Sequence, residues 1–232
     1  TGAGDDIAYT GSVNTDAGFS IIKYGGNGTT GHQIPHRLGV VPDAIFIKSL
    51  TTQSWNCWFP NTSMGGTKMM QLDNTGGTST VSWLNNKMPT TSVVELEAGA
   101  ATNTRDGNND PQPYIMYSWA NKDGYSKVGS YTGNGNADGT FVYTGFRPAY
   151  VMVKRTDNAE NWVLYDNLRA GYNADNDYVL PNTSAAEYTG YKTIDLTSNG
   201  FKLRTTHSDK NASGTYIYLA FAETPFKYSN AR

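Results

Sequence analysis

Apolar side chains recur along this chain in short runs, and each run ends in a cluster of Gly, Asn, Asp or Thr. Residues 44–48 and 150–154 are the clearest runs, and residues 114–119 and 216–222 are the most apolar. Runs of this length that contain Val, Ile, Tyr and Phe between turn residues predict β-strands. We expect about seven strands in each half of the chain and no helix longer than one turn.

Turn signals between these runs predict hairpins. Asn-Gly pairs at residues 27–28 and 134–135 each follow a predicted strand, and Asn-Gly favours a tight hairpin turn with positive φ. Each of the two core runs also continues through a short polar loop into a second strand that begins at Trp55 or Trp162. Strand, short loop and strand predict a further hairpin in each half.

The pattern occurs twice. The stretch from residue 18 to 48 is repeated from residue 124 to 155, and Tyr131 lies 107 residues after Tyr24. Matched positions downstream keep nearly the same spacing, with drifts of a few residues that loop insertions between fixed strands produce. The sequence therefore predicts an internal duplication.

This duplication predicts an all-β fold of two tandem antiparallel β-sandwich lobes of the jelly-roll or lectin-like type. Residues 1–17 are expected to form a linker or leading arm, residues 18–123 the first lobe and residues 124–232 the second. A single larger lectin-like jelly roll built from both copies is the alternative.

Composition narrows the class of protein. The 232 residues carry a net charge of −2 with only 16% charged residues, so we expect no nucleic-acid partner. No apolar run reaches the roughly 18 residues that a membrane span needs, so we expect no membrane partner. Abundant Gly, Asn, Thr and Tyr are typical of all-β extracellular or virion proteins.

The chain has one cysteine, Cys57, which excludes a disulfide within the chain. We expect it to be a small buried apolar residue and not a reactive thiol. Because the chain begins at Thr1 and not at Met, we expect it to be the C-terminal part of a longer polypeptide.

Two oxygen-rich loops are weak candidates for structural calcium. The first contains Asp106, Asn108 and Asp110, and the second contains Asp175 and Asp177. Calcium takes oxygen ligands from such loops. However, neither loop has the spacing of a helix-loop-helix calcium site, and Asn/Asp clusters also form good turns. We expect no other cofactor.

Two further pairs could carry chemistry. His32 and His36 have the spacing of zinc ligands on a helix, but Pro35 forbids a helix there, so we expect a polar loop. Glu95 and Glu97 alternate on a predicted strand and would point to one face, as paired carboxylates of a glycosidase could. The second copy has basic residues at these positions, so we expect a solvated face and not a catalytic pair.

Four tyrosines of the second copy are candidates for receptor or glycan binding: Tyr172, Tyr178, Tyr188 and Tyr191. They lie in loop-rich segments, and exposed tyrosine among Asn, Ser and Gly is typical of binding surfaces. The alternative is that they anchor their loops through ordinary packing.

The run SYTGNGNADGTFVYTGFRPAYVMVKRTDNAENWVLYD (residues 130–166) and the ending NASGTYIYLAFAETPFKYSNAR (residues 211–232) carry a resemblance. They resemble the tandem-repeat domain of tail-fibre and minor structural proteins of marine tailed bacteriophages. The resemblance covers nearly the whole chain and is closest in the second copy. It implies a virion component, from a family without assigned chemistry, and so it supplies no catalytic residue.

We therefore expect a non-enzymatic virion protein of a tailed phage, assembled in the host cytoplasm and displayed on the virion surface. More specifically, the resemblance favours a tail-fibre or fibre-tip adhesin domain that binds a host-surface glycan or protein receptor. Other virion proteins and further copies of this chain, in a trimer, are the expected partners. A capsid decoration or head-fibre protein is the alternative, and a sandwich-fold glycan hydrolase is a third, less favoured one.

Overall fold

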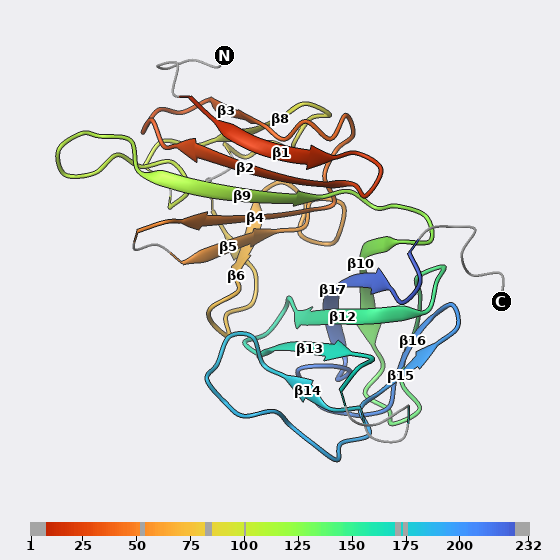
Figure 1. Cartoon of the computed structure of the whole chain (residues 1–232). Helices are drawn as coiled ribbons and strands as arrows, with labels where there is room; N and C mark the ends of the chain where they lie inside the picture. Colours follow the sequence, from red (N-terminus) through yellow and green to blue (C-terminus); the bar gives the residue numbers. More distant parts are fainter. Residues whose placement is uncertain are drawn as a thin grey trace. The chain divides into compact units, whose positions relative to one another are not determined.

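The computed structural model describes residues 8–51, 54–81, 85–99, 101–169, 173 and 176–225. These residues form an all-β protein in which every strand pairing is antiparallel (Figure 1). None of the described residues belongs to a helix that could span a lipid bilayer. The predicted all-β class is confirmed.

The strands, in chain order, are β1 (Thr10–Asn14), β2 (Phe19–Gly25), β3 (His32–Pro35), β4 (Ala44–Ser49), β5 (Trp55–Trp58), β6 (Lys68–Gln71), β7 (Ser79–Thr80), β8 (Val93–Leu96), β9 (Pro113–Trp119), β10 (Ser126–Gly133), β11 (Phe141–Tyr143), β12 (Pro148–Arg155), β13 (Trp162–Asp166), β14 (Tyr178–Val179), β15 (Ile194–Thr197), β16 (Gly200–Leu203) and β17 (Gly214–Ala222).

The chain divides into two compact units. Unit 1 consists of residues 1–72 and 78–120, and unit 2 consists of residues 73–77 and 121–232. The boundary at residue 120 lies close to the predicted one at residue 123. The sequence did not indicate that residues 73–77 belong to the second unit.

Unit 1 contains a seven-stranded sheet in the order β1-β2-β9-β4-β5-β6-β7 and a two-stranded sheet, β3-β8. The expected linker at residues 1–17 is in part a strand, because β1 runs along β2 with Thr10 opposite Lys23. All five residues of β1 are exposed, as suits an edge strand with no apolar face to bury. Cys57 is fully buried on β5, as predicted.

Unit 2 contains a five-stranded sheet in the order β10-β17-β12-β13-β14 and a three-stranded sheet, β11-β16-β15. Both sheets contribute to one hydrophobic core, for example Val151 and Val153 from β12, Ile194 from β15 and Phe201 from β16. Their alternate residues point inward, as in sheets with one buried face. The unit is therefore sandwich-like.

The two types of predicted hairpin have different outcomes. The hairpins that follow the core strands are confirmed, with Phe46 opposite Cys57 in β4–β5 and Val153 opposite Val163 in β12–β13. The hairpins expected at the Asn-Gly pairs are wrong, because β2 and β3 belong to different sheets, and so do β10 and β11.

The Asn-Gly turns nevertheless have the expected backbone. Gly28 and Gly135 have φ values of 68° and 67°, a region that favours glycine. The next strand does not fold back, because the last strand of each unit pairs with the strand before the turn instead: β9 pairs with β2, and β17 pairs with β10. The chain therefore crosses from one sheet to the other at these turns.

Hydrogen bonds hold residues 73–77 in unit 2 at the end of β12. The ammonium group of Lys154, which is fully buried, donates to the carbonyl oxygens of Thr75 (3.1 Å) and Arg155 (3.0 Å). The backbone N–H of Glu160 donates to the same Thr75 carbonyl (2.8 Å). One carbonyl thus receives two bonds, one of them from a cation.

The buried Lys154 predicts a pH-dependent stability. Burial lowers its pKa from 10.5 to about 8, so between these values the unfolded chain binds more protons and the free energy of unfolding rises with pH. From pH 7.5 to 9.5 this contribution amounts to about 2 kcal/mol. Urea unfolding at both pH values should show a gain that is smaller by about this amount in Lys154→Met than in wild type and Lys48→Met, since the other buried lysine, Lys210, is present in all three. An equal gain in all three proteins would exclude Lys154 as its source.

Candidate functional site

Three of the four candidate tyrosines lie together in unit 2, and Tyr172 lies outside the described residues. The rings of Tyr178 and Tyr188 stack with centroids 4.9 Å apart and planes inclined by 4°. The ring of Tyr191 lies 6.1 Å from Tyr178 and 6.3 Å from Tyr188. They meet because Tyr178 and Tyr188 exchange backbone hydrogen bonds of 3.1 and 2.9 Å, which folds the loop back onto β14.

The three tyrosines differ in burial. Tyr178 is 5% exposed and belongs to the core of unit 2, where its ring faces the buried Lys210 Nζ at 4.2 Å. Burial raises the pKa of Tyr178 to about 12. Tyr188 is half-buried, while Tyr191 is 46% exposed. Tyr178 is therefore a packing residue and not a contact residue, and Tyr191 presents its ring to solvent against two other rings.

Polar contacts fix the loop that carries the exposed ring. The Asp177 carboxylate accepts the N–H of Gly190 (3.1 Å), and Gly190 has a φ of 75° that favours glycine. At the other side of the loop, Arg169 pairs with Asp166 (2.6 Å) and Glu187 (2.5 Å). Asp177 is 5% exposed, so this calcium candidate serves the turn.

The other oxygen-rich loop is a turn closed by its own side chain. One carboxylate oxygen of Asp106 accepts the N–H groups of Asn108 and Asp110, each at 2.8 Å. This is an Asx turn, which accounts for the loop's composition. Asp175 lies outside the described residues. Among the residues described, no three His, Cys, Asp or Glu side chains form a group that could hold a metal ion.

The two histidines bind separate partners. His32 Nδ1–H donates to the amide oxygen of Asn103 (3.0 Å), which can only accept. His36 Nε2–H donates to the Thr90 carbonyl (3.1 Å), and its Nδ1 accepts the N–H of Leu38 (3.2 Å). Burial lowers the pKa of both histidines, so the neutral forms are favoured. His32 begins strand β3 and His36 directly follows that strand, and both side chains are buried, so the expected polar loop is wrong for His32.

The two glutamates also have different surroundings. Glu95 forms an ion pair with Lys87 (2.5 Å) and accepts a hydrogen bond from Asn85. These bonds lower the pKa of Glu95, the Lys87 bond contributing most. Glu97 accepts a hydrogen bond from the Thr30 hydroxyl, and of the two glutamates it alone lines a cavity in unit 1.

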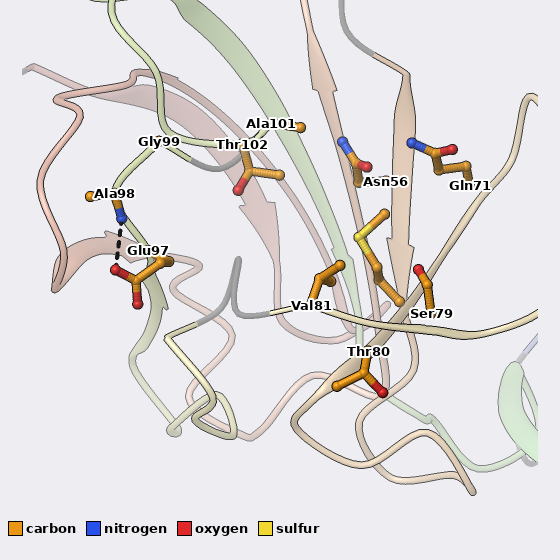
Figure 2. A pocket seen from close by; sticks show the side chains of 11 residues that line it. Asn56, Gln71, Ser79, Thr80, Val81, Glu97, Ala98, Gly99, Ala101 and Thr102 are labelled. Carbon is orange, nitrogen blue, oxygen red and sulfur yellow. Dashed lines mark hydrogen bonds between the residues drawn. The ribbon is translucent and has the colours of Figure 1, made fainter.

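That cavity, of about 560 Å³, was not predicted (Figure 2). Its described lining residues come from β5, β6, β7 and the loops after β7 and β8: Asn56, Met69, Gln71, Ser79, Thr80, Val81, Glu97, Ala98, Gly99, Ala101 and Thr102. Asn56 and Gln71 lie directly opposite each other on neighbouring strands, so their side chains share one face of the sheet. We call this space the unit 1 cavity.

Two fully buried side chains of the unit 1 cavity carry polar atoms without a hydrogen-bond partner in the described part of the chain: Asn56 Oδ1 and Thr102 Oγ1. Both residues are fixed by other bonds. Asn56 Nδ2 donates to the Ser54 carbonyl (3.2 Å), and the Thr102 carbonyl accepts the Tyr24 hydroxyl (2.7 Å). Buried polar groups normally find a partner, so these two atoms distinguish Asn56 and Thr102 from the other described residues that line the cavity.

Sequence reasoning also missed two exposed aromatic side chains on β11. Phe141 is 45% exposed and Tyr143 is 65% exposed, on either side of the buried Val142. Alternate residues of a strand share a face, so the order aromatic, valine, aromatic was a signal that could have identified them.

Comparison with known proteins gives one match. A family model described as "Domain of unknown function (DUF7483)" matches residues 2–225, which is nearly the whole chain. Neither the search of curated proteins nor the search of solved structures found a match. The family match therefore includes both units and carries no statement of activity.

The Asx turn predicts the effect of removing Asp106. Asp106→Ala should lower the free energy of unfolding by about 1 kcal/mol, because two backbone N–H groups lose their acceptor. Asp106→Asn keeps an acceptor oxygen and should cost less. Thermal unfolding in EDTA and in calcium chloride should give the same loss for Asp106→Ala. If the loss occurred only with calcium, the carboxylate would be a metal ligand.

Proposed function

The chain belongs to the DUF7483 family, and we propose that it is a non-enzymatic surface-binding domain of a tailed-phage virion, built from two copies of one β-sandwich module. The resemblance described above supports the virion assignment. In this proposal the ligand is a host-surface glycan or protein receptor. Other virion proteins and further copies of the chain, in a trimer, are its partners.

Strand order supports the duplication. The order β2-β9-β4-β5-β6 in unit 1 corresponds to β10-β17-β12-β13-β14 in unit 2, so the last strand of each unit lies between β2 and β4 or between β10 and β12. The same pair of stacked tyrosines joins β2 to β9 and β10 to β17. Tyr24 and Tyr114 stack at 5.2 Å, and Tyr131 and Tyr216 stack at 4.9 Å. These pairs occupy matching places in the repeat.

The tyrosine cluster is the observation that carries the binding role. Tyr191 is exposed, yet its ring is backed by Tyr178 and Tyr188 and its loop is held by the Asp177 and Arg169 contacts. A fixed ring loses little conformational freedom when it binds, and tyrosine can both stack and form a hydrogen bond. Such a group suits recognition of a sugar or of a protein surface.

The carboxylates favour binding over catalysis. Glycosidases need two carboxyl groups on either side of the bond that is cleaved. Glu95 is paired with Lys87, and Glu97 is the one acidic residue among the described residues that line the unit 1 cavity. We therefore propose recognition without bond cleavage.

Replacing Tyr191 tests the proposed function. The fluorescently labelled chain should bind saturably to cells of a susceptible strain in a panel of marine bacteria. Tyr191→Ala should weaken that binding by about tenfold or more, as loss of a central aromatic contact does. Tyr143→Ala, which removes an even more exposed tyrosine of the same unit, is the matched control and should bind as wild type does.

Tyr143→Ala should change the free energy of unfolding by only about 0.5 kcal/mol. Tyr191→Ala should lower it by about 1 kcal/mol, because the ring loses its contacts with Tyr178 and Tyr188, and should still unfold in one cooperative transition. Unchanged binding by Tyr191→Ala would exclude the tyrosine cluster as the receptor site. Binding to phage heads but to no cell would favour a capsid decoration protein and contradict the adhesin role.

A further inference from the structure

We infer that the unit 1 cavity binds a neutral, hydroxyl-rich ligand of the size of one or two sugar residues. Its volume of about 560 Å³ falls within the range of small-molecule sites, roughly 300–1,000 Å³. The inference depends on the cavity alone and holds whether or not the chain is part of a virion.

The register of the strands shows what occupies the matching place in unit 2. Met69 lies opposite Ser79 in unit 1, and Tyr178 lies opposite Tyr188 in unit 2. Each residue of the second pair follows its counterpart by 109 residues. Two stacked rings therefore stand in unit 2 where unit 1 has a methionine and a serine that line the cavity.

At a second pair of matching positions, unit 2 again has the larger side chain. The Thr102 carbonyl accepts the hydroxyl of Tyr24 (2.7 Å), and the Lys210 carbonyl accepts the hydroxyl of Tyr131 (2.6 Å), so the two positions match. The Lys210 side chain is fully buried and reaches the ring of Tyr178. Threonine is too short to fill that space. The cavity is therefore a place that unit 2 fills with its own side chains and unit 1 leaves open.

The space in unit 1 is also lined by polar residues. Asn56 and Thr102 both line the cavity and each carries one buried polar atom without a described partner, whereas Val163, which lies 107 residues after Asn56, is apolar and fully buried. The amide oxygen of Asn56 can only accept, so it requires an O–H or N–H donor from the ligand. The Thr102 hydroxyl can donate or accept.

The remaining lining residues define the ligand further. Glu97 is the one charged residue among those described, so the cavity disfavours anions and offers acceptors for hydroxyl groups. Gln71 and Ser79 add an amide and a hydroxyl, and Val81 provides apolar surface (Figure 2). Met69 adds further apolar surface. A ring with several hydroxyl groups and a C–H face meets both requirements, and neutral sugars have this chemistry.

NMR titration of the whole chain with glucose, galactose, N-acetylglucosamine and glucuronate tests the inference. At least one neutral sugar should produce saturable shifts of the backbone amides that line the cavity. Glucuronate should bind about fivefold more weakly than the matching neutral sugar, because its carboxylate meets Glu97. Saturation by glucuronate alone, or by none of the four sugars, would overturn the inference.

Thr102→Val distinguishes a binding role from a structural one. The substitution keeps the volume and removes a hydroxyl that has no described partner, so the free protein should unfold at the same or a higher temperature. Sugar binding should weaken about tenfold if the hydroxyl contacts the ligand. Equal affinity in wild type and Thr102→Val would contradict its role as a contact.

Ser118→Ala is the matched control, because Ser118 on β9 carries another fully buried hydroxyl without a described partner and does not line the cavity. It should leave sugar binding unchanged. Tyr191→Ala should also leave the titration unchanged, so loss of cell binding and loss of sugar binding remain separate results.

Discussion

A buried asparagine side chain in each unit satisfies the backbone where the chain leaves one sheet for the other. Asn103 accepts the N–H of Asn27 (2.8 Å), and Asn211 accepts the N–H of Asn134 (3.3 Å). The same side chains also donate to backbone carbonyls, Asn103 to that of Thr29 and Asn211 to that of Asn136. Unpaired backbone groups at such a crossing would cost about 1–3 kcal/mol each. Asn103 and Asn211 directly follow Thr102 and Lys210 in the chain. The bonds that fix the passage from one sheet to the other therefore also fix the positions of Thr102 and Lys210.

This constraint explains which parts of the fold the sequence could predict. The core strands and the hairpins that follow them were predictable because apolar runs and short polar loops are local signals. At the Asn-Gly pairs the positive φ of Gly28 was predictable, but the partner of the preceding strand, β2, was not. That partner, β9, lies about ninety residues away in the chain, and its choice depends on the stacked Tyr24 and Tyr114 and on the bonds of Asn103.

The candidate sites show the same division between local and non-local information. Tyr178 and Tyr191 have similar loop-rich sequence contexts, yet one is packed in the core and the other is exposed. The difference arises from pairing of β14 with the segment of Tyr188, which composition does not encode. The unit 1 cavity was beyond sequence reasoning because its lining comes from separate segments and its unpartnered atoms, on Asn56 and Thr102, are defined only by their surroundings.

If the two units are copies, as we propose, they show how one framework can support different surfaces. The stacked tyrosines and the buried asparagine recur in both units and keep the strands in place. Beside this framework in unit 2, the side chain of Lys210 packs against the ring of Tyr178, and that ring in turn supports the exposed Tyr191. Unit 1 has Thr102 at the matching position, which leaves room for a ligand. The two units share the pairings β2–β9 and β10–β17 although these side chains differ, so in this proposal a change beside the shared framework alters what each unit can bind.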